Sequence, residues 1–281
     1  MAKHRYSIDE KKIARFLKEG RGQGHGANYR PWLTVQDVSS HGRSTRIHSF
    51  KTDREHHLLS DIETAIFLLL DWSDAVIDIR ECFPLGRDET RRIASDMGVQ
   101  HPTDRNTGVE IVMTTDFVVD IQMNNESKLL ARSAKPADQL SDQRTIEKQE
   151  IERRYWASRT SDWGLITNID LPTQRVKNLD WLHEMQSLEF MTEPYSGYWQ
   201  DRCNRFLECL RKTKGIAIKR FFQELESTQG FRTGEGLTIL RHLAANKIIT
   251  FDLDRELNFD NSIDALSITA ISNETFVPRV A

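Results

Sequence analysis

Residues 112–135 read VMTTDFVVDIQMNNESKLLARSAK and decide how the chain folds. Apolar and polar residues alternate through Val112–Ile121, which is the period-two pattern of a half-buried strand. A polar turn follows at residues 124–127, and the strand pattern returns in Lys128–Ala134. The segment therefore predicts an antiparallel β-hairpin.

Alternating strand and helix patterns surround this hairpin. Strand patterns occupy Tyr29–Val38, Arg46–Leu58, Ala75–Ile79 and Trp163–Thr167, and the polar turn 51–54 breaks the second of them into another hairpin. Helix patterns occupy residues 7–20, 60–70, 88–97 and 141–158. Two helices begin with an S-x-x-E capping box, formed by Ser7 with Glu10 and by Ser60 with Glu63. This order of elements predicts an α/β fold.

Leu171-Pro172 marks a predicted domain boundary, because proline disfavours helix for the residue before it and favours a helix start at its own position. We expect two domains, residues 1–170 and 171–281, which also suits the length of the chain. The second domain carries helix patterns at Arg175–Met185, Tyr198–Arg211, Ala217–Leu225 and Gly234–Asn246, and then the strand pattern Lys247–Leu253. A helix followed by a short strand pair is typical of a winged helix.

Three basic side chains of this predicted winged helix, Arg241, His242 and Lys247, are candidates for contact with DNA. The segment carries no excess positive charge, however, and helix-turn-helix modules also serve in contacts between proteins. Both interpretations stay open at the level of sequence.

The composition predicts a folded protein outside membranes and the secretory pathway. Hydrophobic residues make up 38% of the 281 residues and charged residues 29%. No run approaches the roughly 18 apolar residues of a membrane span, and the start MAKHRYSIDEKK lacks an apolar signal region. The three cysteines, Cys82, Cys203 and Cys209, have no CxxC spacing, which argues against disulfides and a cysteine zinc site. We expect a reducing compartment.

Positive charge is concentrated at the start of the chain. Residues 1–50 hold ten Lys and Arg against four Asp and Glu, a net charge of +6, which leaves −9 for residues 51–281 out of the total of −3. A cationic segment of this kind is the usual electrostatic footprint of a protein that binds a phosphate backbone. A solvated basic helix is the alternative interpretation.

The glycine-rich segment GRGQGHG (20–26) follows the first predicted helix, and its backbone can approach another backbone closely. It is not a nucleotide-binding loop, because a helix precedes it where such a loop follows a strand. We predict DNA contacts from this region through four basic side chains, which are Lys11, Lys12, Arg21 and His25. The alternative is a flexible linker.

Asp116 lies inside a strand pattern beside apolar residues, where an ionised side chain is costly unless it is paired or bound to metal. Lys135 ends the next strand, so the two side chains are expected at one end of the sheet. Glu63, one turn into an earlier helix, is the third candidate of this group. Carboxylates hold Mg²⁺, the metal polarises a phosphate and activates water, and a lysine stabilises the developing charge. The three residues together predict phosphodiester hydrolysis.

Each of these residues also has a plainer interpretation. Glu63 completes a capping box, Lys135 fits a surface lysine, and Asp116 fits an ion pair with a nearby arginine. Singly, the plainer interpretations hold. The combination, in this order and on these elements, favours a metal-dependent nuclease.

The spacing resembles the PD-(D/E)XK nuclease core, which joins an aspartate on one strand to a (D/E)-x-K motif on the next. Ser133 stands here at the (D/E) position, and a hydroxyl is a weak, neutral ligand for Mg²⁺. We therefore expect the metal to be held by Glu63, Asp116, Ser133 and a backbone carbonyl near Ala134. The same departure also fits a degenerate nuclease that only binds DNA.

Seven segments taken together make a more specific resemblance. They are GRGQGHG (20–26), PWLTVQ (31–36), HHLLSDIE (56–63), DIRECFPL (78–85), TTDFVVD (114–120), AKPA (134–137) and ERRYW (152–156). In order and spacing they are similar to the TnsA family, the endonuclease subunits of the Tn-seven group of cut-and-paste transposons. The similarity extends over residues 3–170 and more weakly through the C-terminal part.

The resemblance implies a restriction-endonuclease-like N-terminal domain that cuts the 5′ ends of the transposon, while a DDE-type (TnsB-like) transposase subunit cuts and joins the 3′ ends. It implies that Glu63 and Asp116 match metal-binding carboxylates and that Lys135 matches the motif lysine. Ser133 takes the place of the family's usual glutamine. Glu152 matches an acidic position whose plainer interpretation is an exposed helix glutamate in ion pairs.

The resemblance further implies Mg²⁺ as the cofactor, with Mn²⁺ as a substitute, and a cytoplasmic location in a bacterium. The implied partners are transposon-end DNA, the DDE-type transposase subunit and a regulatory ATPase (TnsC-like), which the winged-helix-like C-terminal domain contacts. Two other functions stay open. One is an autonomous PD-(D/E)XK nuclease that cuts DNA without partners, and the other is a catalytically inactive subunit that binds DNA and partner proteins.

Overall fold

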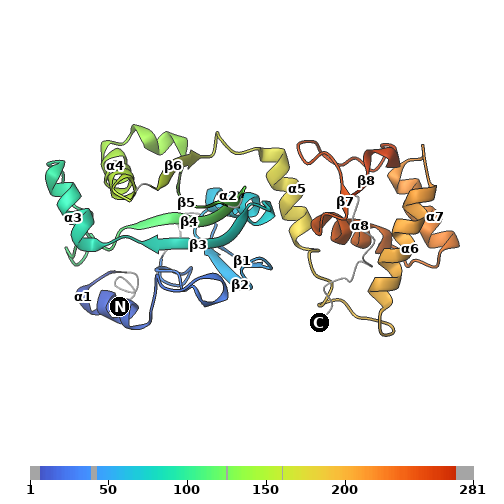
Figure 1. The fold of residues 1–281 in the computed structure, drawn as a ribbon, viewed down its shortest axis with the longest axis horizontal. Helices are drawn as coiled ribbons and strands as arrows, with labels where there is room; N and C mark the ends of the chain where they lie inside the picture. The colour runs from blue at the N-terminus through green and yellow to red at the C-terminus, as the bar shows by residue number, and fades with distance from the viewer. Residues whose placement is uncertain (1–6, 39–42, 125, 160, 270–281) are drawn as a thin grey trace. The chain divides into compact units, whose positions relative to one another are not determined.

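The chain divides into two compact units, Met1–Leu171 and Pro172–Ala281. The structure is a computed structural model and describes residues 7–38, 43–124, 126–159 and 161–269 (Figure 1). Each unit has its own buried core.

The first unit is built on a four-stranded mixed sheet with the order β3-β4-β5-β6. The strands are β3 (Val76–Pro84), β4 (Thr114–Met123), β5 (Glu126–Lys135) and β6 (Asp162–Thr167). β4 is antiparallel to β3 and to β5, whereas β6 runs parallel to β5. The hairpin predicted in residues 112–135 is therefore confirmed as β4 and β5. A separate two-stranded sheet, β1 (Thr45–Ser49) and β2 (Arg54–Leu58), confirms the other predicted hairpin.

Four helices belong to this unit. They are α1 (Glu10–Lys18), α2 (Asp61–Trp72), α3 (Arg87–Asp96) and α4 (Gln143–Ala157). Figure 1 shows α1 below the sheet and α4 above it. Short 3-10 turns at Gly26–Asn28 and Ala137–Ser141 complete the described elements of the unit.

Separate groups of apolar side chains attach α4 and α1 to the sheet. Val118 of β4 and Ala131 of β5 pack with Ile151 and Trp156 of α4. Phe16 of α1, which is fully buried, packs in another group with Trp32 and Cys82. Burial of an aromatic side chain of this kind stabilises a fold by about 2–3 kcal/mol. Strands of the four-stranded sheet thus share one buried cluster with α4 and another with α1.

The strand predicted over Tyr29–Val38 is wrong, because the described residues 29–38 form no strand. The alternating side chains act as separate anchors instead. Tyr29 and Trp32 are buried, Tyr29 Oη donates to the carbonyl of Glu81, and Trp32 N donates to the carbonyl of Cys82. Pro31 has no N–H to give to a ladder, so the segment lies along β3 without pairing regularly with it.

The first helix also begins later than its capping box predicts. Asp9, rather than Ser7, is the N-cap of α1, and its carboxylate accepts the Lys12 N–H. At α2 the prediction is confirmed, because Ser60 is the N-cap and its hydroxyl accepts the Glu63 N–H.

The second unit contains four helices and one short strand pair. The helices are α5 (Thr173–His183), α6 (Tyr198–Lys212), α7 (Ile218–Thr228) and α8 (Glu235–Ala245), and the strands are β7 (Ile249–Thr250) and β8 (Ser267–Ile268). The strand predicted over Lys247–Leu253 is shorter in the structure, because only Ile249–Thr250 forms a strand. Phe206, Phe221 and Leu240 lie in the buried core shared by α6, α7 and α8.

Two of the three candidates for contact with DNA in this unit, Arg241 and His242, are engaged in contacts within the unit. The Arg241 guanidinium donates to the carbonyl of Trp181 and pairs with Glu184, and its side chain is 12% exposed. His242 is fully buried, and its Nδ1 lies 2.9 Å from the carbonyl of Met185. α8 is therefore an inner helix, which the packing of α5 against it covers.

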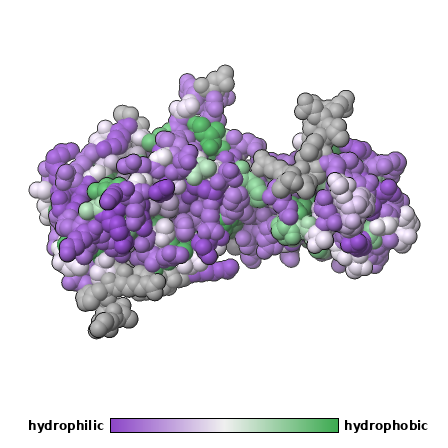
Figure 2. Space-filling model, turned by 90° about the horizontal axis from the view of Figure 1, so that it is seen from below, coloured by the Kyte–Doolittle hydropathy of each residue, from purple (hydrophilic) through white to green (hydrophobic). Residues whose placement is uncertain are grey.

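The face seen in Figure 2 is mostly hydrophilic, and apolar residues appear on it in small groups. Among the described residues, no helix combines the length and the apolar character needed to cross a membrane.

Candidate active site

The site forms where β4 and β5 separate. Their registered pairing ends at Phe117↔Arg132, although β5 continues to Lys135. Beyond that point a side chain replaces the backbone as hydrogen-bond acceptor: the Asp116 carboxylate oxygen Oδ2 accepts the Ala134 N–H at 2.7 Å. Lys135 Nζ lies 3.3 Å from the same oxygen and 2.7 Å from the Ala134 carbonyl oxygen. The structure thus brings Asp116, Ala134 and Lys135 together, as their sequence pattern predicts.

The Asp116–Lys135 ion pair is only partly exposed. The side chains are 20% and 29% accessible, respectively. The Asp116 carboxylate raises the pKa of Lys135 despite the opposing effect of burial, and Glu152 and Glu63 add to the increase. Lys135 therefore carries a positive charge at neutral pH and is placed to stabilise negative charge next to Asp116.

Glu63 approaches from the first turn of α2 and serves in the predicted capping box. Its carboxylate accepts hydrogen bonds from Leu59 N and Ser60 Oγ, each at 2.9 Å. Burial and the neighbouring Asp116 carboxylate raise the pKa of Glu63 to about 7. Glu63 can therefore both cap α2 and act at the site, because the capping carboxylate also faces the charge of Asp116.

Ser133 is turned toward α4. Its hydroxyl is fully buried and donates to Glu152 Oε1 at 2.5 Å. Thr115 Oγ1 donates to the same carboxylate oxygen at 2.6 Å and itself accepts the Trp156 Nε1–H at 2.7 Å. The Ser133 side chain is therefore engaged with Glu152, and this contact accounts for the presence of a hydroxyl at that position.

Glu152 is not the exposed helix glutamate of its plainer interpretation, because only 3% of it is exposed. Burial and the Asp116 carboxylate raise its pKa to about 7, against the opposing effect of the Ser133 and Thr115 hydroxyls. Besides the family resemblance of ERRYW (152–156), the sequence gives one signal for Glu152, its place near the apolar residues Ile151, Tyr155 and Trp156. No pattern in the sequence indicates Thr115, whose role depends on a contact 37 residues away.

The donor set at this site fits a hard divalent cation. Glu63 and Asp116 present carboxylate oxygens, and like charges at close range raise the pKa of Glu63. A bound cation would relieve that repulsion, and oxygen donors are what Mg²⁺ and Mn²⁺ prefer. Glu63, Asp116 and the backbone carbonyl near Ala134 are the groups that would hold the metal.

The four predicted DNA contacts fall into two pairs. Lys11 and Lys12 lie with Arg15 on α1 along an open polar cavity of about 540 Å³. Lys11 is exposed and Lys12 partly so. This cluster presents three cations to solvent, as a phosphate contact requires.

Arg21 and His25 have other neighbours. The Arg21 guanidinium pairs with Asp37 and Glu19, donates to the Trp32 carbonyl and stacks on Phe16, so it ties the N-terminal segment together. His25 is exposed, but its Nδ1 faces the carboxylates of Asp78 and Asp120. Neither environment favours a phosphate.

A buried ionic network lies behind the site and carries no clear signal in the sequence. Glu81 of β3 accepts two hydrogen bonds from Arg54, at 2.8 and 2.5 Å, and its Oε2 lies 2.8 Å from His56 Nδ1. Cys82, the next residue, has a positive φ of 48° and a thiol whose pKa burial raises, with further increases from Asp116 and Glu63. The network therefore fixes β3 beside the site.

Two family models and a known protein match the chain. Residues 73–168 match the family model described as TnsA-like endonuclease N terminal, and residues 170–253 match the one described as TnsA endonuclease C terminal. The chain is 41% identical over 273 residues, which cover 97% of each chain, to transposon Tn7 transposition protein TnsA of Escherichia coli. The match spans both units. The chain belongs to the TnsA endonuclease family.

Proposed function

We propose that the protein is the DNA endonuclease subunit of a heteromeric cut-and-paste transposase and that it hydrolyses phosphodiester bonds at the 5′ ends of the transposon. The observation that carries this proposal is the convergence of Glu63, Asp116 and Lys135 where β4 and β5 separate, in a chain of the TnsA endonuclease family. The cleaving domain is unit Met1–Leu171, with a PD-(D/E)XK core.

In this proposal each residue has a distinct task. Glu63 and Asp116 hold Mg²⁺, for which Mn²⁺ substitutes, and the ion supplies Lewis-acid stabilisation of the phosphate. Lys135 stabilises negative charge beside Asp116 and orients the attacking water. Ser133 and Glu152 act from behind the site, because Ser133 Oγ donates to Glu152.

The α1 cluster of Lys11, Lys12 and Arg15 contacts the phosphate backbone. Its support is the open polar cavity that these three cations line, together with Asp9 and Asp37. Arg21 and His25 are not part of this cluster, because the Arg21 guanidinium pairs with Asp37 and the His25 imidazole faces Asp78. Phosphate contacts are independent of sequence and weaken as salt rises.

We also propose that the second unit, Pro172–Ala281, is a winged-helix-like domain with α8 as its inner helix and β7–β8 as its short wing. The proposed partners are transposon-end DNA, a DDE-type (TnsB-like) transposase subunit and a regulatory (TnsC-like) ATPase. The support for this assembly is the relative's description as a transposition protein.

The test is strand-mapped cleavage of a plasmid that bears the transposon ends, with the partner transposase and Mg²⁺. The variants are Asp116→Ala and Lys135→Ala. Matched controls are Asp162→Ala and Lys128→Ala, which change the same residue types at exposed positions of the same sheet. We expect the 5′-strand cuts to fall by about two orders of magnitude or more in the first two variants only.

Two other outcomes would favour the other functions. Cleavage of plain plasmid by the isolated protein would indicate an autonomous nuclease. Persistence of the 5′ cuts in both site variants would show that this chain only binds DNA and partner proteins.

A further inference from the structure

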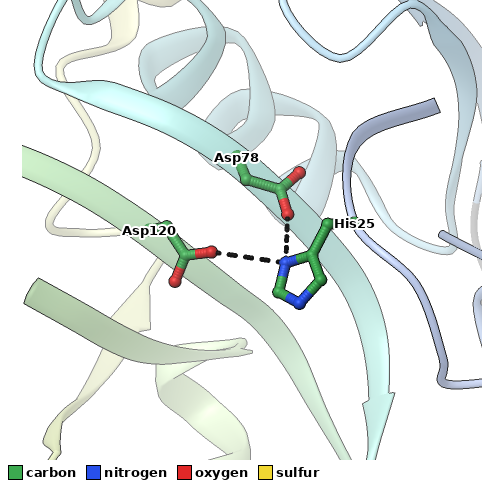
Figure 3. A group of neighbouring side chains, drawn as sticks. All are labelled: His25, Asp78 and Asp120. Carbon is green, nitrogen blue, oxygen red and sulfur yellow. Dashed lines mark hydrogen bonds and ion pairs between the residues drawn. The ribbon is translucent and has the colours of Figure 1, made fainter. Parts of the chain in front are cut away.

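His25, Asp78 and Asp120 come together at the surface of the first unit, outside the candidate active site (Figure 3). His25 belongs to the glycine-rich segment 20–26, Asp78 to β3 and Asp120 to β4. Figure 3 shows both carboxylates pointing toward the imidazole. One nitrogen and two carboxylate oxygens from three separate segments thus lie within 4.8 Å of one another.

The spacing of these atoms suits a small tetrahedral ion. His25 Nδ1 lies 3.3 Å from Asp78 Oδ2 and 3.7 Å from Asp120 Oδ2. Ligands about 2.0–2.1 Å from a tetrahedral Zn²⁺ are roughly 3.3–3.4 Å apart, because the edge of a tetrahedron is about 1.6 times its centre-to-vertex distance. Only small side-chain shifts separate this arrangement from a coordinating one.

Hydrogen bonds from outside the trio orient the two carboxylates. Asp78 Oδ1 accepts the Gly26 N–H at 3.1 Å and the Ile79 N–H at 2.9 Å, which leaves Oδ2 toward His25. Asp120 is held by the Arg80 guanidinium, which donates to both of its oxygens at 2.9 Å. Metal-binding carboxylates are usually held by such outer hydrogen bonds.

Arg80 is the charged group that faces this trio, and its single positive charge does not neutralise both carboxylates. One guanidinium against two carboxylates leaves a net charge of −1 when His25 is neutral. Arg80 Nε is buried and, among the described residues, finds no hydrogen-bond acceptor, although Asp78 Oδ2 is 3.4 Å away. A hydroxide ligand on a metal at this position would be an acceptor for it. The orphaned donor is independent of the spacing argument.

The donor types separate this trio from the active site. An imidazole nitrogen with two carboxylates favours Zn²⁺ and similar transition ions, whereas the oxygen donors of Glu63 and Asp116 favour Mg²⁺. The His25 side chain is 71% exposed, so an ion can enter from solvent and keep a water ligand.

We propose that His25, Asp78 and Asp120 form a second metal site, which takes Zn²⁺ or a similar transition ion and fastens the glycine-rich segment to β3 and β4. The ion links His25 to residues that are 53 and 95 positions away in the chain. Its binding therefore stabilises the folded unit, since the unfolded chain does not preform the site.

The test is titration of the full-length protein with Co²⁺, a spectroscopic substitute for Zn²⁺, in a large excess of Mg²⁺ that saturates oxygen-only sites. We expect one equivalent to bind with the visible absorption of a four-coordinate ion and to be displaced by Zn²⁺. His25→Ala and Asp120→Asn should lose this step. Asp120→Asn keeps a side-chain oxygen for Arg80, so its fold is preserved.

His48→Ala is the matched control, because His48 is a half-exposed histidine of the same unit with a single carboxylate, Asp53, 3.9 Å away. It should retain the Co²⁺ step, and so should Asp116→Ala, in which the proposed active site is disabled. Zn²⁺ should raise the Tm of wild type and His48→Ala but not of His25→Ala. Absence of saturable Co²⁺ binding in wild type, or an unchanged step in His25→Ala, would overturn the proposal without bearing on Mg²⁺-dependent cleavage.

Discussion

Ser60 and Glu63 hold each other through two reciprocal hydrogen bonds at the start of α2. Ser60 Oγ accepts the Glu63 N–H at 3.1 Å and donates to Glu63 Oε1 at 2.9 Å. The same carboxylate faces Asp116, which together with burial raises its pKa to about 7. The helix cap therefore positions one of the two acids that we propose hold the metal.

Ser60→Ala should affect stability and pH dependence together. Loss of the N-cap should lower the free energy of unfolding by about 1 kcal/mol. Because the Ser60 hydroxyl lowers the pKa of Glu63, its removal should raise that pKa further and shift the acid limb of cleavage to higher pH. Denaturant unfolding and the pH profile of 5′-strand cleavage measure the two effects. Ser60→Thr, which retains a hydroxyl that can accept and donate, should preserve stability.

The raised pKa values of Glu63 and Glu152 predict that the metal-free protein loses stability as pH rises. A glutamate has an ordinary pKa of 4.5, and each of these acids has a folded-state pKa of about 7, so the folded state binds more protons between these values. The stabilisation is present below pH 4.5 and is lost as pH rises through 7, on the order of 3 kcal/mol per group. Thermal unfolding between pH 5 and pH 8 measures it.

Glu152→Gln isolates one of these two contributions. Both hydroxyls, from Ser133 and Thr115, donate to Glu152 Oε1, and the amide oxygen of glutamine can accept both. The variant should therefore fold, and its Tm should fall less between pH 5 and pH 8 than that of wild type. An unaltered pH slope would show that Glu152 is not the titrating group. Mg²⁺ should raise the Tm of wild type more at pH 8 than at pH 6, because protons compete for Glu63.

Most elements of the first unit could be predicted from local patterns. The strand pattern of Val112–Ile121 predicts β4, and Ser60 with Glu63 marks a helix start that the structure shows. The same reasoning was wrong for Tyr29–Val38, where each buried ring anchors to β3 separately and no ladder forms. Alternation of apolar and polar residues indicates which side chains are buried, but it does not indicate whether the backbone pairs with a neighbouring strand.

The candidate site, too, could be predicted from the sequence only in part. Asp116 and Lys135 could be brought together from hairpin geometry alone, because both sit near one end of adjoining strands. The environment of Glu152 could not, because its burial depends on α4 packing across Ser133 and Thr115. The contacts of Arg241 also required the structure, since α5 supplies the carbonyl that it binds.

The buried Glu81 network predicts acid sensitivity of the opposite sign to that of Glu63. Burial alone would raise the pKa of Glu81, but hydrogen bonds from Arg54 and His56 hold it at about 2. Its stabilisation is present above the ordinary glutamate pKa of 4.5 and is lost as pH falls toward 2. Glu81→Gln leaves the buried Arg54 charge without its partner and should cost about 3–5 kcal/mol. Urea unfolding at pH 7 tests this value, and a cost below that of Ser60→Ala would contradict it.

Two glycines of the segment 20–26 allow close approach to be separated from backbone strain. Gly20 and Gly22 both have positive φ, 71° and 77°, which an L-residue adopts only with strain. A Cβ at Gly20 would meet nothing within 4 Å, whereas a Cβ at Gly22 would lie 2.1 Å from Pro84 Cγ. Gly22→Ala should therefore destabilise the first unit by more than Gly20→Ala, whose cost is about 1 kcal/mol from strain alone. Equal losses of unfolding free energy in the two variants would show that the contact between this segment and the end of β3 does not limit the residue at position 22.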